Sequence, residues 1–162
     1  MADITNQSLN EIIENVKTKK VSSTELTKAY VKNIESAKKL NAFVTTTFDQ
    51  ALDNAKQFDN KPNFDQLLPG IPLAVKDLFC TENTKTTAGS NILNNFIPSY
   101  ESTVTKNLWG NGSFLLGKLN CDEFAMGSSN ETSHYGNVIN PVGDQLVPGG
   151  SSGGSSSALA AD

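Results

Sequence analysis

The sequence predicts an α/β protein, and three observations lead to that prediction. Residues 70–76 and 112–118 are short, nearly continuous apolar runs bounded by turn residues, as is typical of buried parallel strands. Between them, residues 103–109 have the apolar spacing of a helix that can connect two parallel strands. Two amphipathic helices come before both runs. The chain should therefore form a sheet covered by helices and preceded by a helical arm.

The helical arm is predicted from two capping boxes. Ser8 is followed three residues later by Glu11, and Ser22 is followed in the same way by Glu25. Behind each box, apolar residues recur at helical spacing. They are Leu9, Ile12, Ile13 and Val16 in the first helix, and Leu26, Tyr30, Ile34 and Ala37 in the second.

Three further elements follow the arm. Residues 42–47 form a short segment that is rich in β-branched side chains, which predicts a strand. Phe48, Ala51 and Ala55 then recur at the spacing of another helix. The polar residues 59–66 are expected to form a surface loop.

Size and charge exclude several classes of protein. A chain of 162 residues can form one domain, which buries roughly two-thirds of its surface. The net charge of −4 argues against a nucleic-acid-binding face, so a partner should make any such contact. No apolar stretch approaches the roughly 18 residues needed to span a bilayer, and the N-terminus does not resemble an export signal. We therefore expect a cytoplasmic protein without membrane contact.

Histidine and cysteine chemistry is not expected. His134 is the only histidine, and no serine or carboxylate has the spacing to it that a Ser-His-Asp site would need. Cys80 and Cys121 are far apart and have neither metal-binding nor redox-motif spacing, so we expect both to be reduced and buried. No metal or cofactor is expected in this chain. The chemistry that remains is that of serine activated by lysine.

The glycine- and serine-rich residues 148–157 have two interpretations. Their composition alone is typical of a flexible linker. Paired glycines that lead into a helix also let backbone N–H groups approach an anion or a carbonyl. A phosphate-binding loop does not fit, because no Gly-Lys-Ser/Thr tripeptide is present. ATP binding by this chain is therefore not expected.

Lys76, at the end of an apolar strand, also has two interpretations. Its ammonium group could reach water while its stem packs on the strand. As a base it would need a pKa about three units below the ordinary value of about 10.4, which burial among apolar neighbours could supply. Asp77 would oppose this if its carboxylate folded back onto the ammonium group, because an opposite charge stabilises the protonated form.

Four segments resemble the amidase signature family in the same order along the chain: residues 70–77, 85–90, 117–130 and 148–155. Within the family, residues 122–133 are similar to the A subunits of aspartyl/glutamyl-tRNA amidotransferases. The resemblance covers nearly the whole chain. It implies the amidase signature fold, in which helices cover a mixed sheet.

The resemblance also implies roles for individual residues. Lys76 would be the catalytic base, and Ser151 the bridging serine that passes a proton between the base and the nucleophile. Gly127, Ser128 and Ser152 would bind substrate. The Gly150–Ser151 peptide bond would be cis.

The nucleophile of the family is the main departure. It lies about two dozen residues beyond the bridging serine, in a second glycine-rich loop with the oxyanion-hole amides, whereas this sequence ends eleven residues after Ser151. We therefore expect only the N-terminal part of the fold. Residues 1–68 would form the helical arm and first strand, and residues 69–162 the start of the amidase core.

The implied activity is hydrolysis of glutamine, which would supply ammonia for converting Glu-tRNA(Gln) or Asp-tRNA(Asn) to the amidated forms. The B and C subunits would be partners, one of them using ATP and magnesium, and mischarged tRNA would be met only through the complex. The 162 residues alone should be inactive. A stand-alone amidase and a non-catalytic truncated fragment are the alternatives.

Overall fold

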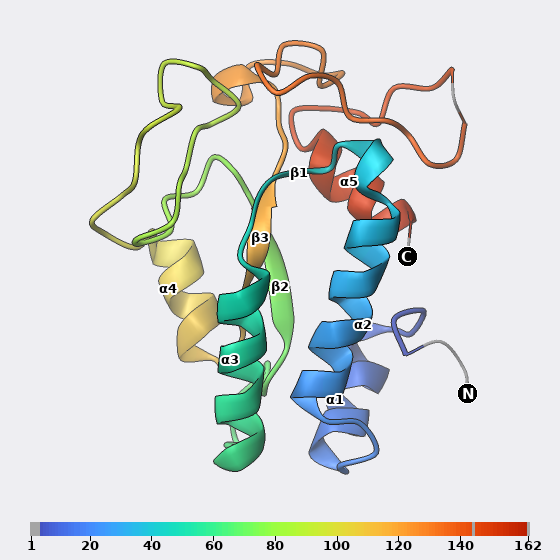
Figure 1. The fold of residues 1–162 in the computed structure, drawn as a ribbon, viewed down its shortest axis with the longest axis vertical. Coiled ribbons are helices and arrows are strands. Elements are labelled where there is room, and N and C mark those ends of the chain that lie inside the picture. The colour runs from blue at the N-terminus through green and yellow to red at the C-terminus, as the bar shows by residue number, and fades with distance from the viewer. Residues whose placement is uncertain (1–3, 144, 162) are drawn as a thin grey trace.

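The computed structural model, which describes residues 4–143 and 145–161, has a three-stranded sheet with helices packed against it (Figure 1). The strands are β1 (Phe43–Thr46), β2 (Pro72–Lys76) and β3 (Phe114–Leu119). The helices are α1 (Leu9–Lys17), α2 (Ser23–Ser36), α3 (Phe48–Asn60), α4 (Thr103–Gly110) and α5 (Gly153–Ala160), with short 3-10 turns η1 (Lys38–Leu40) and η2 (Glu123–Ala125).

The first two helices begin where the capping boxes predict. Ser8 caps α1 and Ser22 caps α2, and in each box the glutamate three residues later accepts the N–H of the capping residue at 2.9 Å. Each box satisfies backbone groups that a helix start would otherwise leave without partners. Local sequence therefore sets both starts.

The sheet is mixed, as the resemblance implies. Its strand order is β1-β3-β2, with β2 parallel and β1 antiparallel to β3. All residues of β3 are buried because it is the central strand. The expected division of the chain at residue 68 stays a prediction, but β1 lies in the same sheet as the two later strands.

Two apolar clusters hold the first three helices on the sheet. One joins α1 and α2 to the start of β2 through Ile12, Val16, Leu26 and Ile71. The other packs α3 on β3 through Ala51, Ala55, Phe114 and Leu116. Burial of each larger aliphatic side chain contributes about 1.5–3 kcal/mol, so the helices are held mainly by this packing.

The long loops gather at the carboxyl ends of β2 and β3, above the sheet in Figure 1. In open sheets with parallel strands, this end is where ligands bind. Helix α5 also packs against β2, so the glycine-rich segment before it reaches the same region. The sheet thus brings together three stretches that are far apart in the sequence: the loop after β2, the loop after β3 and the glycine-rich segment before α5.

Two sequence expectations need correction, and one of two open interpretations is excluded. The loop expected at 59–66 starts later, because α3 continues to Asn60 and Asp59 accepts the N–H groups of Ser23 and Thr24 at 2.9 Å. Cys80 is only partly buried, unlike Cys121. Residues 148–157 are not a free linker, because α5 begins at Gly153 and its first two residues are buried. None of the described helices is both long and apolar enough to cross a membrane.

Candidate functional site

The residues expected as base and relay are in contact. Lys76 is the last residue of β2, and Ser151 lies two residues before α5. The Nζ atom of Lys76 donates a hydrogen bond to Oγ of Ser151 at 2.6 Å, and the contact is partly buried. The two residues are 75 positions apart, so the sheet and the packing of α5 bring them together. A hydroxyl in this position can give its proton to the amine when the amine is neutral.

The backbone around Ser151 is unusual. The Gly150–Ser151 peptide bond is cis, as the resemblance implies, and Gly149 has a φ of 80°. A positive φ of this size favours glycine. The carbonyl of Ser151 accepts the N–H of Asp122 at 3.1 Å, which attaches the glycine-rich loop to the segment after β3.

The three residues expected to bind substrate lie beside this loop. Gly127 and Ser128 are exposed in the segment after η2. A Cβ on Gly150 would collide with the backbone of Ser128, so the two loops touch. Ser152 is the N-cap of α5, and its carbonyl accepts the N–H groups of Ser155 and Ser156 at 3.0 and 3.1 Å. Their substrate role stays a prediction.

Asp77 faces Lys118 rather than Lys76. Its Oδ1 lies 3.6 Å from the Nζ of Lys118, and both side chains are fully buried. Its Oδ2 accepts the N–H of Thr87 at 3.0 Å and also the hydroxyl of Thr87. Burial raises the pKa of Asp77 and lowers the pKa of Lys118, because it penalises both charges. The condition under which Asp77 would oppose a neutral Lys76 is therefore not met, since the carboxylate turns to Lys118 instead.

The single histidine and the two cysteines have different surroundings. His134 is exposed and packs edge-on against Tyr135. Both cysteines are free, and burial raises the pKa of the Cys121 thiol to about 11. Within the described residues, no group of three or more His, Cys, Asp or Glu side chains could hold a metal ion.

Two buried residues near Ser151 were not predicted from the sequence. The Asp122 carboxylate is fully buried and accepts three hydrogen bonds from Asn130 and Thr132. Asn130 has a φ of 67° and a fully buried side chain that packs against Gly153 at the start of α5. The sequence signal for these two buried side chains was limited to the glycines that pack against them, at positions 127, 150 and 153.

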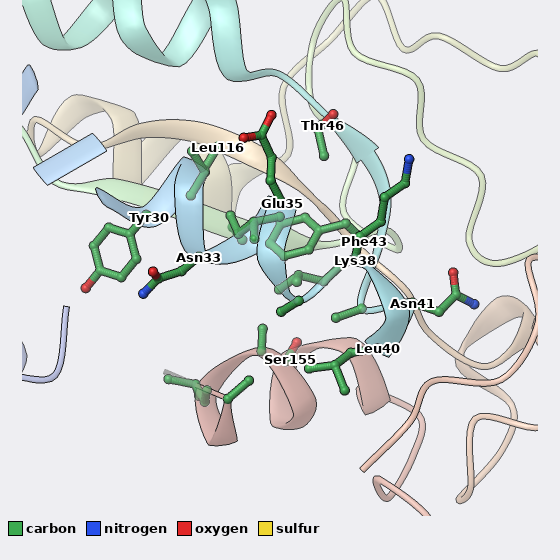
Figure 2. Close-up of a pocket in the computed structure, with 18 of the residues that line it drawn as sticks. Tyr30, Asn33, Glu35, Lys38, Leu40, Asn41, Phe43, Thr46, Leu116 and Ser155 are labelled. Carbon is green, nitrogen blue, oxygen red and sulfur yellow. The ribbon is translucent and has the colours of Figure 1, made fainter. Parts of the chain in front are cut away.

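A separate pocket of about 680 Å³ lies away from the Lys76 and Ser151 contact. Helix α2, strand β1 and helix α5 surround it (Figure 2). Its lining is mainly apolar and includes Ile34, Leu40, Phe43, Leu73, Leu116 and Leu159. Such a lining suits packing of another apolar group better than acid-base chemistry.

The profile of the Amidase family matches residues 25–162. The A subunit of glutamyl-tRNA(Gln) amidotransferase from Pelagibacter ubique is 64% identical over 162 residues, which are 100% of this chain and 33% of that protein. The crystal structure of the corresponding A subunit from Thermotoga maritima matches with a TM-score of 0.77 and 32% identity, over 98% of this chain and 32% of that one. Native peptide amidase from Stenotrophomonas maltophilia matches with a TM-score of 0.84 and 29% identity, over 95% of this chain and 34% of that one. The chain thus spans about a third of the length of these relatives.

Proposed function

Because the chain belongs to the amidase family, we propose that it supplies the base, Lys76, and the bridging serine, Ser151, of a Ser-Ser-Lys amidase site in a glutamine-hydrolysing amidotransferase. The observation that carries the proposal is the 2.6 Å contact between Lys76 Nζ and Ser151 Oγ. The amidotransferase branch is favoured because the Pelagibacter ubique relative, at 64% identity, is an A subunit of such an enzyme.

The proposed proton path needs a neutral Lys76. The nucleophilic serine gives its proton to Ser151 Oγ as it attacks the glutamine amide carbon, and Ser151 gives its own proton to Lys76 Nζ. The ammonium group of Lys76 then returns a proton along the same path to the leaving ammonia. Water releases glutamate from the acyl-enzyme, so the sum is glutamine and water giving glutamate and ammonia.

In the proposed site, the acylated serine and the oxyanion hole would come from beyond residue 162, as the family resemblance implies. The 162 residues by themselves would then hold the base and the relay but not the atom that they activate. We expect no ammonia release from glutamine by a 162-residue polypeptide. Turnover by that polypeptide, abolished by Lys76→Ala, would disprove this part of the proposal.

The proposed partners are the B and C subunits of the amidotransferase. One of them would receive the ammonia and use ATP and magnesium to amidate Glu-tRNA(Gln) or Asp-tRNA(Asn). This division of labour fits the net charge of −4 and the absence of a phosphate-binding motif from the sequence. We expect the complex to work in the cytoplasm, where aminoacylated tRNA is used.

The direct test is a graft in which these 162 residues replace the matching third of the Pelagibacter ubique relative, produced together with the other subunits of that amidotransferase. The graft should release ammonia from glutamine. Lys76→Ala and Ser151→Ala should each lower kcat by at least about 1,000-fold, because both changes break the proton path. Asp65→Asn, a change at an exposed residue of the loop before β2, should leave kcat unaltered.

A stand-alone amidase is the second candidate, because the peptide amidase of Stenotrophomonas maltophilia has a TM-score of 0.84 to this chain. The same graft distinguishes the two candidate functions. Faster turnover of simple peptide amides than of glutamine, without any need for the other subunits, would favour the second candidate.

A further inference from the structure

We infer that Asp122 is a positioning residue, which holds Ser151 in reach of Lys76 and locks the neighbouring loop, residues 126–132, against the cis peptide bond. The inference rests on the proposed function, since it assigns a residue to the same site. Asp122 does not touch the proton path itself. It acts through Ser151 and through the loop.

The Asp122 carboxylate is fully buried and takes its hydrogen bonds from one loop. Its Oδ2 accepts the N–H of Asn130 at 3.0 Å, and its Oδ1 accepts the hydroxyl and the N–H of Thr132 at 2.9 and 3.4 Å. The ion pairs found among the described residues do not include Asp122. The loop donors therefore compensate its charge, and the loop cannot leave without breaking all three of these hydrogen bonds.

Two glycines lie against the same carboxylate. A Cβ on Gly127 or on Gly150 would collide with the side chain of Asp122. The carboxylate thus fills the space between the loop and the residue before the cis peptide bond. Neither glycine has room for a side chain while the carboxylate is there.

The backbone of Asp122 completes the connection. Its N–H donates to the carbonyl of Ser151 at 3.1 Å. Asp122 comes three residues after β3, and β2 lies beside β3 and ends at Lys76, so the sheet fixes the distance between Lys76 and Asp122. One residue thereby sets the place of Ser151 through its backbone and the place of the loop through its side chain.

The inference is tested in the graft, assembled with its partner subunits, by Asp122→Asn. The amide keeps the size of the carboxylate but turns an N–H donor toward one of the loop donors. A displacement of about 1 Å at a catalytic group lowers the rate by about 100-fold, so kcat should fall by about that factor. The KM for glutamine should rise several-fold, because Gly127 and Ser128 move with the loop. Asp65→Asn is the matched control.

A merely structural role would give a different result. It would lower the fraction of active enzyme and therefore kcat, while the KM for glutamine stayed the same. Thr132→Val and Thr132→Ser extend the test if Asp122→Asn does not fold. The valine removes the hydroxyl donor and should raise KM, whereas the serine keeps the donor and should restore it. An unchanged KM in Asp122→Asn, or in Thr132→Val if Asp122→Asn does not fold, would overturn the inference.

A second measurement separates this inference from the proposed function. Hydrogen exchange of the amides in residues 126–132 should be at least tenfold faster in Asp122→Asn or Thr132→Val than in the unmodified graft, whether or not glutamine is hydrolysed. If the unmodified graft lacks glutaminase activity while exchange responds as expected, the proposed function fails and the locking of the loop stands. Unchanged exchange in both variants would overturn the locking of the loop, even if Lys76→Ala abolishes activity.

Discussion

Asp77 and Lys118 form a fully buried ion pair between the residue after β2 and the penultimate residue of β3, with Oδ1 3.6 Å from Nζ. The Nζ atom of Lys118 also donates to the carbonyl of Phe79 at 2.8 Å and to the hydroxyl of Thr86 at 2.7 Å. The pair thus ties the loop after β2 to the central strand. Since this loop starts next to Lys76, its anchoring also limits the movement of the proposed base.

Loss of one partner of this pair should be severe. Lys118→Met leaves a buried carboxylate without its cation, and breaking a buried pair in this way destabilises a protein by about 3–5 kcal/mol. Urea unfolding followed by circular dichroism measures the change. The matched control is Lys56→Met, which removes the exposed pair between Lys56 and Asp53, at 2.9 Å, and should lower the free energy of unfolding by at most about 1 kcal/mol. If both substitutions lowered the free energy of unfolding equally, burial would not be what makes the Asp77–Lys118 pair important for stability.

The two cysteines should react very differently with a thiol reagent. Cys121 is fully buried, and burial raises its pKa to about 11, so little thiolate forms near neutral pH. Cys80 is partly exposed, and its Sγ lies 3.3 Å from the hydroxyl of Tyr100. Titration with Ellman's reagent at pH 8 should therefore label one thiol in the folded protein and two in urea. Rapid labelling of folded Cys80→Ser would show that Cys121 is accessible after all.

The acid stability of the protein should depend on its capping boxes. The hydrogen bond from the Ser22 N–H, helped by the Ser22 hydroxyl, lowers the pKa of Glu25. A carboxylate whose pKa is lower in the folded state stabilises the fold above its unfolded pKa of about 4.3, and this contribution is lost as the pH falls through the folded pKa. Melting temperatures from pH 7 to pH 3 should therefore fall less steeply for Glu25→Gln than for the unmodified chain. Glu35→Gln, at the exposed end of the same helix, serves as control and should keep the original slope.

Local signals made the helices and strands predictable. The serine and glutamate of each capping box lie three residues apart, so their interaction is formed within one helical turn and is visible in the sequence. The short apolar runs that became β2 and β3 were also predictable from neighbouring residues, although only the central strand β3 is buried throughout, whereas β2 lies at the edge of the sheet and is partly buried. The end of α3 was placed too early because Asp59 belongs to a polar stretch whose contact is with α2, 36 residues away.

The site was predictable only in part, because its contacts join distant segments. The roles of Lys76 and Ser151 came from the family resemblance, and nothing in their spacing of 75 residues shows that they touch. The partners of Asp77 and Asp122 could not be assigned at all. A buried carboxylate can pair with any nearby donor, and which donor is near depends on the paired strands and on the loop between them.

Two glycines in helices give the last prediction, since the same substitution should have opposite effects on them. Helical propensity alone favours alanine over glycine by about 1 kcal/mol. At Gly110, the exposed last residue of α4, a Cβ would meet no atom within 4 Å, so Gly110→Ala should raise the free energy of unfolding by up to that amount. At Gly154, in the first turn of α5, a Cβ would lie 2.5 Å from the carbonyl oxygen of Ala42 and 2.6 Å from the backbone nitrogen of Asn120. Neither backbone atom can move without disturbing the ends of β1 and β3.

Gly154→Ala should therefore lower the free energy of unfolding by about 1–3 kcal/mol, the usual effect of overpacking. In the graft it should also lower kcat, because α5 would have to move away from the sheet and Ser151 lies just before it. Urea unfolding of both variants and ammonia release by the grafts measure the two effects. If Gly154→Ala stabilised the protein as much as Gly110→Ala, the close approach of α5 to Ala42 and Asn120 would be wrong, and with it the way in which the sheet positions Ser151.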